Sequence, residues 1–235
     1  MTPAPAFTPL SSLPNFDPRN VAVAGVDAHL PRVADEFLRP QALRQRFQNP
    51  PLWQPEVRDE PKYADRSPMR AAVLVPVVMR EQPTVLLTER TAHLSTHSGQ
   101  IAFPGGKADD EDADDAATAL REAEEEVGLA HGFVQVLGTL PVYTTGSSFI
   151  ITPVVALVQP GFTLNPNANE VADVFEVPLG FLMDPANHQR HSVDLNGLRR
   201  EWFSMPYKVP GETSSRFIWG ATAGMLRNFY RFLAA

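Results

Sequence analysis

Apolar runs rich in β-branched residues recur along the chain from Met69 onward and predict strands. Two of them, "AAVLVPVVMR" and "TVLLTER", are separated only by "EQP", which is typical of neighbouring strands joined by a tight turn. We expect strands at residues 71–80, 84–90, 133–143, 149–158, 171–177, 199–207 and 216–220.

Two segments have helical periodicity instead. Residues 113–127 form an acidic amphipathic segment, and residues 221–233 place apolar side chains on one side, namely Ala223, Leu226, Phe229, Tyr230 and Leu233. Strands that mostly neighbour one another, with helices set between them, predict an α+β domain with a mixed β-sheet.

The first part of the chain has a different composition. Many of the 23 prolines fall before residue 69, in pieces such as "QNPPLWQPE". We therefore predict a Pro-rich extension over residues 1–66, with one short helix where Leu43 and Phe47 stand four residues apart, and a main domain over residues 67–235. Packing or dimer contact is a better explanation for the extension than catalysis.

Composition excludes several classes of protein. The absence of cysteine removes disulfides, thiolate nucleophiles and cysteine-ligated metals. A net charge of -7 argues against a nucleic-acid partner, because phosphate tracking relies on clustered Lys and Arg. No apolar run spans a membrane and no export signal precedes the fold, so we expect a soluble, cytoplasmic protein without a membrane partner.

The acidic helix concentrates carboxylates on one face. At about 100° per residue, Glu122, Glu125 and Glu126 share a face, while Glu124 points the opposite way. A solvated helix face usually alternates charge sign, and this one does not. Like charges in the last turn repel one another and oppose the helix dipole. A hard divalent cation, Mg²⁺ or Mn²⁺, is the natural compensation for this repulsion.

A glycine turn precedes the helix in "FPGGK". Gly105 and Gly106 allow a sharp turn that brings a backbone carbonyl close to whatever the glutamates hold. The turn is not a P-loop, because GxxxxGK[ST] is absent and Lys107 is followed by Ala108.

Together these residues resemble the Nudix hydrolase signature Gx5Ex7REUxEExGU, in which U is a bulky aliphatic residue. "REAEEEVGL" at residues 121–129 fits, with Ala123 at the first U. Asp112 stands where the family has Glu, and the interval to Arg121 is one residue longer. The resemblance implies a Nudix-type α/β/α sandwich that hydrolyses a nucleoside diphosphate linked to another moiety.

The resemblance also implies roles for individual residues. Divalent metals would be held by Glu122 and Glu126, with Glu125 and the Gly105 carbonyl contributing. Arg121 would orient the carboxylates through charge-assisted hydrogen bonds. Two residues are candidates for the general base, Glu125 and, in the later segment "NPNANEVADVF", Glu170.

Upstream, "LLTERTAHLSTHSGQIAFPGG" resembles the segment of the coenzyme A pyrophosphatase branch, roughly LLTxRSxxLxxHxGQxxFPGG, with Thr91 in place of Ser. This similarity implies cleavage of coenzyme A to adenosine 3′,5′-bisphosphate and 4′-phosphopantetheine. The expected substrate contacts are Arg90, His97, Gln100 and Lys107. The resemblance and the Pro-rich extension also favour a homodimer.

Other readings stay open. The same helix serves hydrolysis of ADP-ribose or another nucleoside diphosphate derivative, or a nucleotide-sensing module without catalysis. The retention of all three glutamates argues against the sensing module. His188 and His191 form a spaced pair in a segment expected to be a loop, where an exposed or hydrogen-bonded role is favoured over a metal site.

Overall fold

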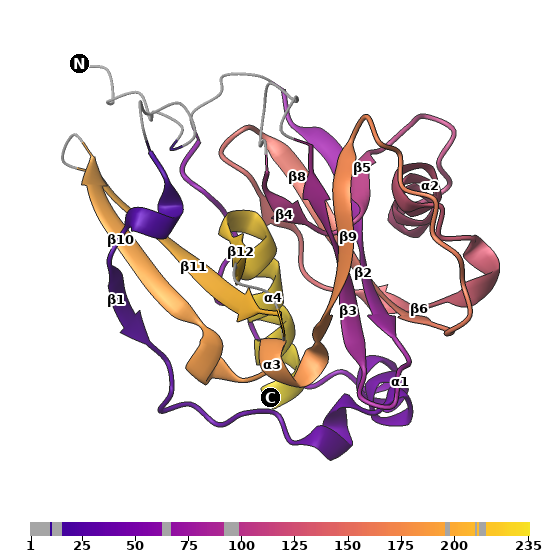
Figure 1. Ribbon diagram of the computed structural model, residues 1–235, viewed down its shortest axis with the longest axis horizontal. Helices are drawn as coiled ribbons and strands as arrows, with labels where there is room; N and C mark the ends of the chain where they lie inside the picture. Colours follow the sequence, from indigo (N-terminus) through magenta and orange to yellow (C-terminus); the bar gives the residue numbers. More distant parts are fainter. Residues whose placement is uncertain are drawn as a thin grey trace.

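The computed structural model describes residues 10, 16–62, 67–91, 99–195, 198–209, 211 and 215–235. Of the described strands, eight form a large sheet in which β4-β3-β2-β8-β6 are successive neighbours, while β5 pairs with β2, β7 with β8 and β9 with β3 (Figure 1). Their bounds are β2 (Met69–Val78), β3 (Thr84–Arg90), β4 (Ile101–Ala102), β5 (Gly105–Lys107), β6 (Val134–Thr139), β7 (Tyr143–Thr144), β8 (Phe149–Val158) and β9 (Val171–Pro178).

The large sheet is mixed, as the sequence predicted. Strands β2 and β8 run parallel along their whole length, and the other described pairs in this sheet are antiparallel. Helix α2 (Asp115–Val127) covers one face and α4 (Gly220–Ala234) lies against the other (Figure 1). Because both faces are covered, β2 and β8 are buried almost throughout, which explains their continuous apolar runs. The α/β/α sandwich is confirmed.

A second, antiparallel sheet lies on the far side of α4 (Figure 1). Its order is β1-β10-β11-β12, with bounds β1 (Val23–Val26), β10 (Gln189–Leu195), β11 (Leu198–Lys208) and β12 (Ser215–Trp219). The sequence predicted β11 and β12 but missed the other two. Strand β1 is only four residues long, and β10 is mostly polar, so neither has a clear apolar pattern. The expectation of a loop around His191 is wrong, because this residue lies within β10.

The short elements complete the chain. Helix α1 (Pro40–Gln48) confirms the helix predicted in the extension: Leu43 is buried, and the Phe47 ring lies 4.8 Å from that of Phe232 on α4. Strands β6 and β7 replace the single strand expected at 133–143. The remaining elements are α3 (Leu179–Leu182) and the 3-10 turns η2 (Pro18–Asn20), η3 (Asp35–Leu38), η4 (His131–Phe133) and η5 (Pro185–Asn187).

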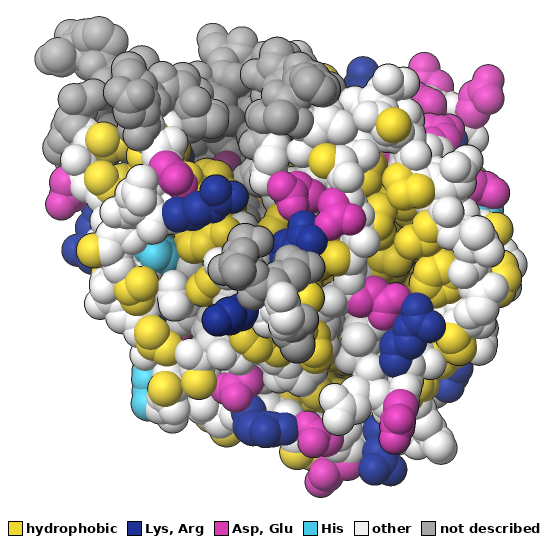
Figure 2. All heavy atoms as spheres, viewed as in Figure 1, with side chains coloured by type: hydrophobic (Ala, Val, Ile, Leu, Met, Phe, Trp, Pro, Cys, Tyr) yellow, Lys and Arg dark blue, Asp and Glu magenta, His cyan; other side chains and the backbone are white. Residues whose placement is uncertain are grey.

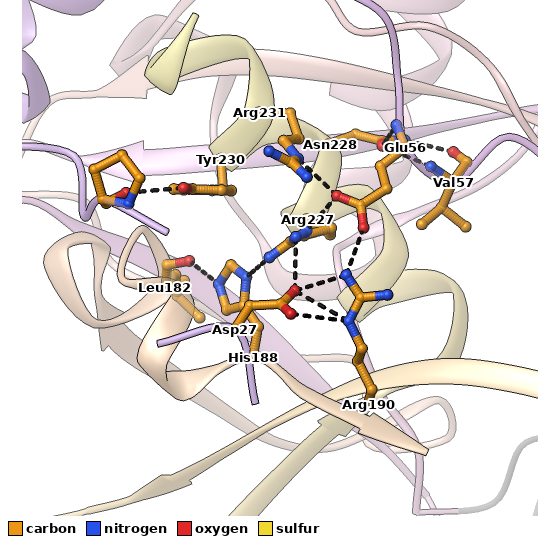
Figure 3. A network of polar contacts seen from close by, with 11 residues as sticks. Asp27, Glu56, Val57, Leu182, His188, Arg190, Arg227, Asn228, Tyr230 and Arg231 are labelled. Atoms are coloured by element: carbon orange, nitrogen blue, oxygen red, sulfur yellow. Dashed lines mark hydrogen bonds and ion pairs between the residues drawn. The ribbon is translucent and has the colours of Figure 1, made fainter. Parts of the chain in front are cut away.

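A buried polar network joins the N-terminal extension to α4 (Figure 3). The Arg227 side chain is fully buried and forms ion pairs of 2.7 Å with both Asp27 and Glu56. Arg190 of β10 shares the Asp27 carboxylate at 2.8 Å. Burial alone would raise the pKa of Asp27, but the Arg190 hydrogen bonds and the charge of Arg227 lower it. The extension thus packs against α4, whereas the domain division near residue 67 stays a prediction.

His188 belongs to the same network. Its Nδ1 accepts a hydrogen bond from Arg227 Nη1 at 3.0 Å, and its Nε2 lies 2.8 Å from the Leu182 carbonyl oxygen, to which it donates (Figure 3). Burial, aided by the nearby Arg227 charge, lowers the pKa of His188 to about 4. Both His188 and His191 are buried, so an exposed position is wrong and the hydrogen-bonded role is confirmed.

The surface is chemically mixed. On the face drawn in Figure 2, basic and acidic side chains are interspersed with apolar ones. None of the helices in the described part of the chain combines the length and apolar character that a bilayer crossing requires.

Candidate active site

Helix α2 is held at both ends and along one side. At its N-terminus the Asp114 carboxylate accepts a hydrogen bond from the Ala117 N–H group at 2.8 Å. At its C-terminus Gly128 adopts a left-handed conformation with φ of 71°, and a Cβ there would lie 2.7 Å from the Asn165 nitrogen. The inward stripe is buried at Ala119, Ala123 and Val127. These contacts fix the rotation of the helix and therefore the direction of its glutamates.

Two of those glutamates lie against the glycine turn. The Gly105 N–H group donates to Glu126 Oε2 at 3.0 Å. A Cβ on Gly106 would lie 2.5 Å from the Glu122 carboxyl carbon, so any other residue there would displace this carboxylate from its present position. Gly105 has φ of 153°, and a Cβ there would lie 2.5 Å from the Val73 Cα atom on β2. The turn is thus packed between the sheet and the acidic face of α2.

Arg121 organises the acidic residues around it. Its Nε and Nη2 atoms donate to the two Asp112 oxygens, each at 3.0 Å. Its Nη1 donates to Glu122 at 3.0 Å and to Glu125 at 3.1 Å, and its Nη2 also reaches the Lys107 carbonyl oxygen at 3.1 Å. The paired bonds from Arg121 hold the pKa of Asp112 well below its usual range. Asp112 therefore anchors Arg121 from the loop before the helix.

Glu126 is the most deeply buried carboxylate of the helix face, with a side chain only 7% exposed. Burial, together with the charges of Glu122 and Glu170, raises its pKa from the usual 4.5 to about 7. The Gly105 N–H group and Arg90, whose Nη1 lies 3.8 Å from Glu126 Oε1, act in the opposite direction. Burial likewise raises the pKa of Glu122. The site holds more negative charge than its own cations neutralise.

The loop before β9 closes over the C-terminal end of α2. The Asn167 N–H group donates to the Glu126 carbonyl oxygen at 2.9 Å. The Asn167 side chain donates to Glu170 Oε1 at 3.2 Å, and the Thr91 N–H group donates to the Glu170 carbonyl oxygen at 3.0 Å. Glu170 thus comes within electrostatic range of the helix face from a distant part of the sequence. Sequence reasoning missed Asn167, for which the only signal was the turn-rich string "NPNAN".

Comparison with known proteins agrees with this arrangement. The sequence model of the NUDIX domain matches residues 68–195. The chain belongs to the NUDIX family. It is 41% identical over 166 residues to NudL of Photorhabdus laumondii, named as an uncharacterized Nudix hydrolase, covering 71% of this chain and 86% of that protein. It is 43% identical over 157 residues to NudL of Yersinia enterocolitica, covering 67% of this chain and 77% of the relative.

Solved structures resemble this chain more distantly. The Ap4A hydrolase binary complex of C. elegans matches 50% of this chain and 85% of its own, with 19% sequence identity and a TM-score of 0.41. A likeness of this size carries no argument about the present protein. Membership of the Nudix hydrolases, which the signature predicted, is confirmed by the family match and the NudL relatives.

The Nudix glutamates are placed unequally. Glu122 and Glu126 meet at the glycine turn, but the Glu125 side chain is 60% exposed and bonded to Arg121. Glu124 lies on the other side, exposed, with an oxygen 3.2 Å from His131 Nε2. The wheel therefore placed Glu124 correctly. The described contact of Gly105 with a glutamate is made by its N–H group, and the ligand role of its carbonyl stays a prediction.

The residues expected to contact the substrate lie in different surroundings. Arg90 faces Glu126, and its N–H group donates to the Gln100 carbonyl oxygen at 3.1 Å. The Gln100 side chain points to the start of α4, since its Nε2 lies 3.6 Å from the position of a Cβ on Gly220. Lys107 is exposed on β5. His97 lies outside the described residues.

No metal site is preformed in the described part of the chain, where no group of three or more His, Asp or Glu side chains is arranged to hold an ion. A hollow of about 530 Å³ lies at the opposite end of α2, lined by Asp115, Thr152, Phe47, Trp53 and Phe232 among others. It includes none of the residues expected to act in a Nudix site. The carboxylates beside the glycine turn, and not this hollow, form the candidate active site.

Proposed function

We propose that this Nudix hydrolase cleaves the diphosphate of coenzyme A, with Mg²⁺ or Mn²⁺, to give adenosine 3′,5′-bisphosphate and 4′-phosphopantetheine. The observation that carries the proposal is the position of Arg90. This residue belongs to the upstream segment that resembles the coenzyme A pyrophosphatase branch, and its guanidinium lies 3.8 Å from Glu126 of the Nudix helix. The substrate-selecting segment and the acidic helix face would then form one site.

The chemistry of the carboxylates fits a divalent cation. Glu122 and Glu126 are both largely buried, and each is made harder to ionise by burial and by the charge of Glu170. Carboxylate oxygens are the ligands that Mg²⁺ and Mn²⁺ prefer. When bound, such an ion would neutralise charge on the diphosphate and activate a water for in-line attack on phosphorus.

The chain's own groups would orient the reactants. Arg121 holds one oxygen of Glu122, and the Gly105 N–H group holds Oε2 of Glu126. The second oxygen of Glu122, and Glu126 Oε1 beside Arg90, would face a ligand. Arg90 carries a guanidinium that can bind a phosphate. Lys107 is exposed on β5, and its ammonium would bind the 3′-phosphate that distinguishes coenzyme A from ADP-ribose.

Of the two candidate general bases, the surroundings favour Glu170. Its carboxylate is half-buried and its charge acts on both Glu122 and Glu126. Glu125 instead is mostly exposed and bonded to Arg121, which fits a structural partner of that arginine. We therefore assign proton abstraction from the attacking water to Glu170 and the support of Arg121 to Glu125.

The experiment is to incubate the purified full-length chain with Mg²⁺ or Mn²⁺ and either coenzyme A or ADP-ribose, and to identify products by mass spectrometry. Glu126→Gln should abolish turnover, while the matched control Glu124→Gln, on the exposed side of the same helix, should retain it. Cleavage of ADP-ribose alone would support diphosphate hydrolysis and would overturn coenzyme A as the substrate. Inertness toward both would favour another nucleotide or a binding module.

A homodimer and a cytoplasmic location belong to the same proposal. Both rest on the resemblance and on composition. Sedimentation equilibrium of the full-length chain tests the first, with a molecular mass of about twice 25.9 kDa expected for the dimer.

A further inference from the structure

Arg216 connects the second sheet to the large sheet. From β12 its Nη1 donates to Glu89 of β3 at 2.9 Å, and its Nη2 lies 2.7 Å from Asp173 of β9. Its guanidinium also lies 4.6 Å from the centre of the Phe175 ring on β9. The Arg216 side chain is only 18% exposed, whereas Glu89 is 32% and Asp173 46% exposed. One arginine thus ties together three strands.

The two carboxylates that it binds are directly paired across the strands. Glu89 of β3 is opposite Asp173 of β9 in the antiparallel register. Like charges in directly opposite positions destabilise a strand pair. Arg216 contacts both carboxylates and offsets this repulsion.

The pairing becomes irregular immediately beyond this point. After the Glu89–Asp173 pair the register shifts, and Arg90 pairs with Val171, so Ala172 is the extra residue of a β-bulge. Bulges bend a strand and redirect the side chains beside them. The next groups along both strands belong to the candidate active site, because Arg90 faces Glu126 and the Thr91 N–H group holds the Glu170 carbonyl oxygen.

We propose that Arg216 is a positioning residue for this site. It clamps the last regular pair before the bulge and thereby sets where Arg90 lies relative to the acidic face of α2. Successive side chains on a strand point to opposite faces, so the clamp on Glu89 acts from behind the sheet and makes no described contact with Glu122 or Glu126. The catalytic consequence rests on the proposed function.

The test is a double-mutant cycle on kcat/KM for coenzyme A in the full-length protein. Because a displacement of about 1 Å can cost roughly 100-fold in rate, Arg216→Met should lower kcat/KM at least about tenfold. If Arg216 acts through Arg90, the double variant Arg216→Met/Arg90→Met should be no slower than Arg90→Met alone, within about twofold. A purely structural role of Arg216 would give independent, multiplicative losses.

Arg80→Met is the matched control. Arg80 also pairs with a glutamate of β9, Glu176, at 2.6 Å, and lies 5.6 Å from an aromatic ring, that of Phe162. The Arg80–Glu176 ion pair lies toward the end of β9 that is opposite the bulge. Its loss should change kcat/KM by less than about twofold and should combine independently with Arg90→Met.

Crystal structures of the variants provide a readout that needs no substrate. In Arg216→Met the Arg90–Glu126 contact should lengthen beyond the present 3.8 Å, and Arg216→Lys should restore it in part. If Arg216→Met does not fold, Arg216→Lys takes its place in the cycle: it keeps one cation beside Glu89 and Asp173 but loses the paired guanidinium nitrogens, so it should weaken the clamp without abolishing it. Multiplicative losses, or an unmoved Arg90, would overturn the inference. If the wild-type protein does not cleave coenzyme A, only the proposed substrate is overturned. The position of Arg90 in the crystal structures of wild type and Arg216→Met would still test the proposed role of Arg216.

Discussion

Replacing Glu126 by glutamine should make the metal-free protein more stable while removing its activity. Glu126 is almost fully buried, and its raised pKa means that the folded protein binds a proton on this carboxylate more tightly than the unfolded chain does. Stability is therefore lost as pH rises from about 4.5 to about 7, and it stays low above that. Glutamine keeps an oxygen that can accept from Gly105 N–H and carries no charge.

The size of the effect follows from the same pKa. One pKa unit corresponds to roughly 1.4 kcal/mol. A rise in the pKa of Glu126 from the usual 4.5 to about 7 therefore lowers the free energy of unfolding at pH 8 by about 3 kcal/mol. For a protein of 235 residues this is roughly 6 to 12 °C in Tm. At pH 4.5 the carboxyl group is protonated in the folded state and half protonated in the unfolded chain, so the ionisation contributes less than about 0.5 kcal/mol and wild type and variant should differ little.

Thermal unfolding followed by circular dichroism, in EDTA and at pH 4.5 and 8, measures this difference. Glu124→Gln is the control, because Glu124 is exposed and its replacement should change stability by less than about 0.5 kcal/mol. Addition of Mg²⁺ at pH 8 should raise the Tm of wild type more than that of Glu126→Gln, since a ligand stabilises in proportion to its affinity for the folded state. A Glu126→Gln protein no more stable than wild type at pH 8 in EDTA would refute the reasoning.

Three further predictions concern the glycine turn and the buried network. Gly106→Ala should place a methyl group against the Glu122 carboxylate and lower kcat at least about tenfold, measured by product release. Arg227→Met should cost about 3 kcal/mol in urea unfolding, because the Asp27 carboxylate stays buried and of its two arginine ion pairs keeps only that with Arg190. Because the pKa of His188 is lowered to about 4, stability should fall as pH drops from about 6.5 to about 4, and His188→Asn should flatten this part of the pH–stability curve.

Each of these has an internal check. Gly132→Ala adds a methyl group where no atom lies within 4 Å, so it should leave kcat unchanged; an equal loss in both variants would contradict the crowding at Gly106. Adding Asp27→Asn to Arg227→Met should recover part of the lost stability, and a further loss would mean that charge imbalance is not the cause. An unaltered pH profile in His188→Asn would assign the acid sensitivity to the carboxylates instead.

The sequence by itself determined the local elements and the family. The continuous apolar runs of β2 and β8 predicted strands because burial on both faces leaves no polar positions. The helical wheel separated Glu124 from the other glutamates because helix geometry is a property of neighbouring residues alone. The signature from Arg121 to Leu129 identified the family for the same reason, since the spacing of its residues is local.

Tertiary structure decided which of these groups meet. Glu122 and Glu126 face the glycine turn while Glu125 turns to Arg121, a choice that depends on how α2 packs on the sheet. Contacts such as Arg227 with Asp27, or Arg216 with Glu89, join residues that are far apart in the sequence, and no periodic pattern in the sequence predicts them. Only the folded chain brings these charges together, because the energy of an ion pair depends on distance and burial in space and not on separation along the sequence.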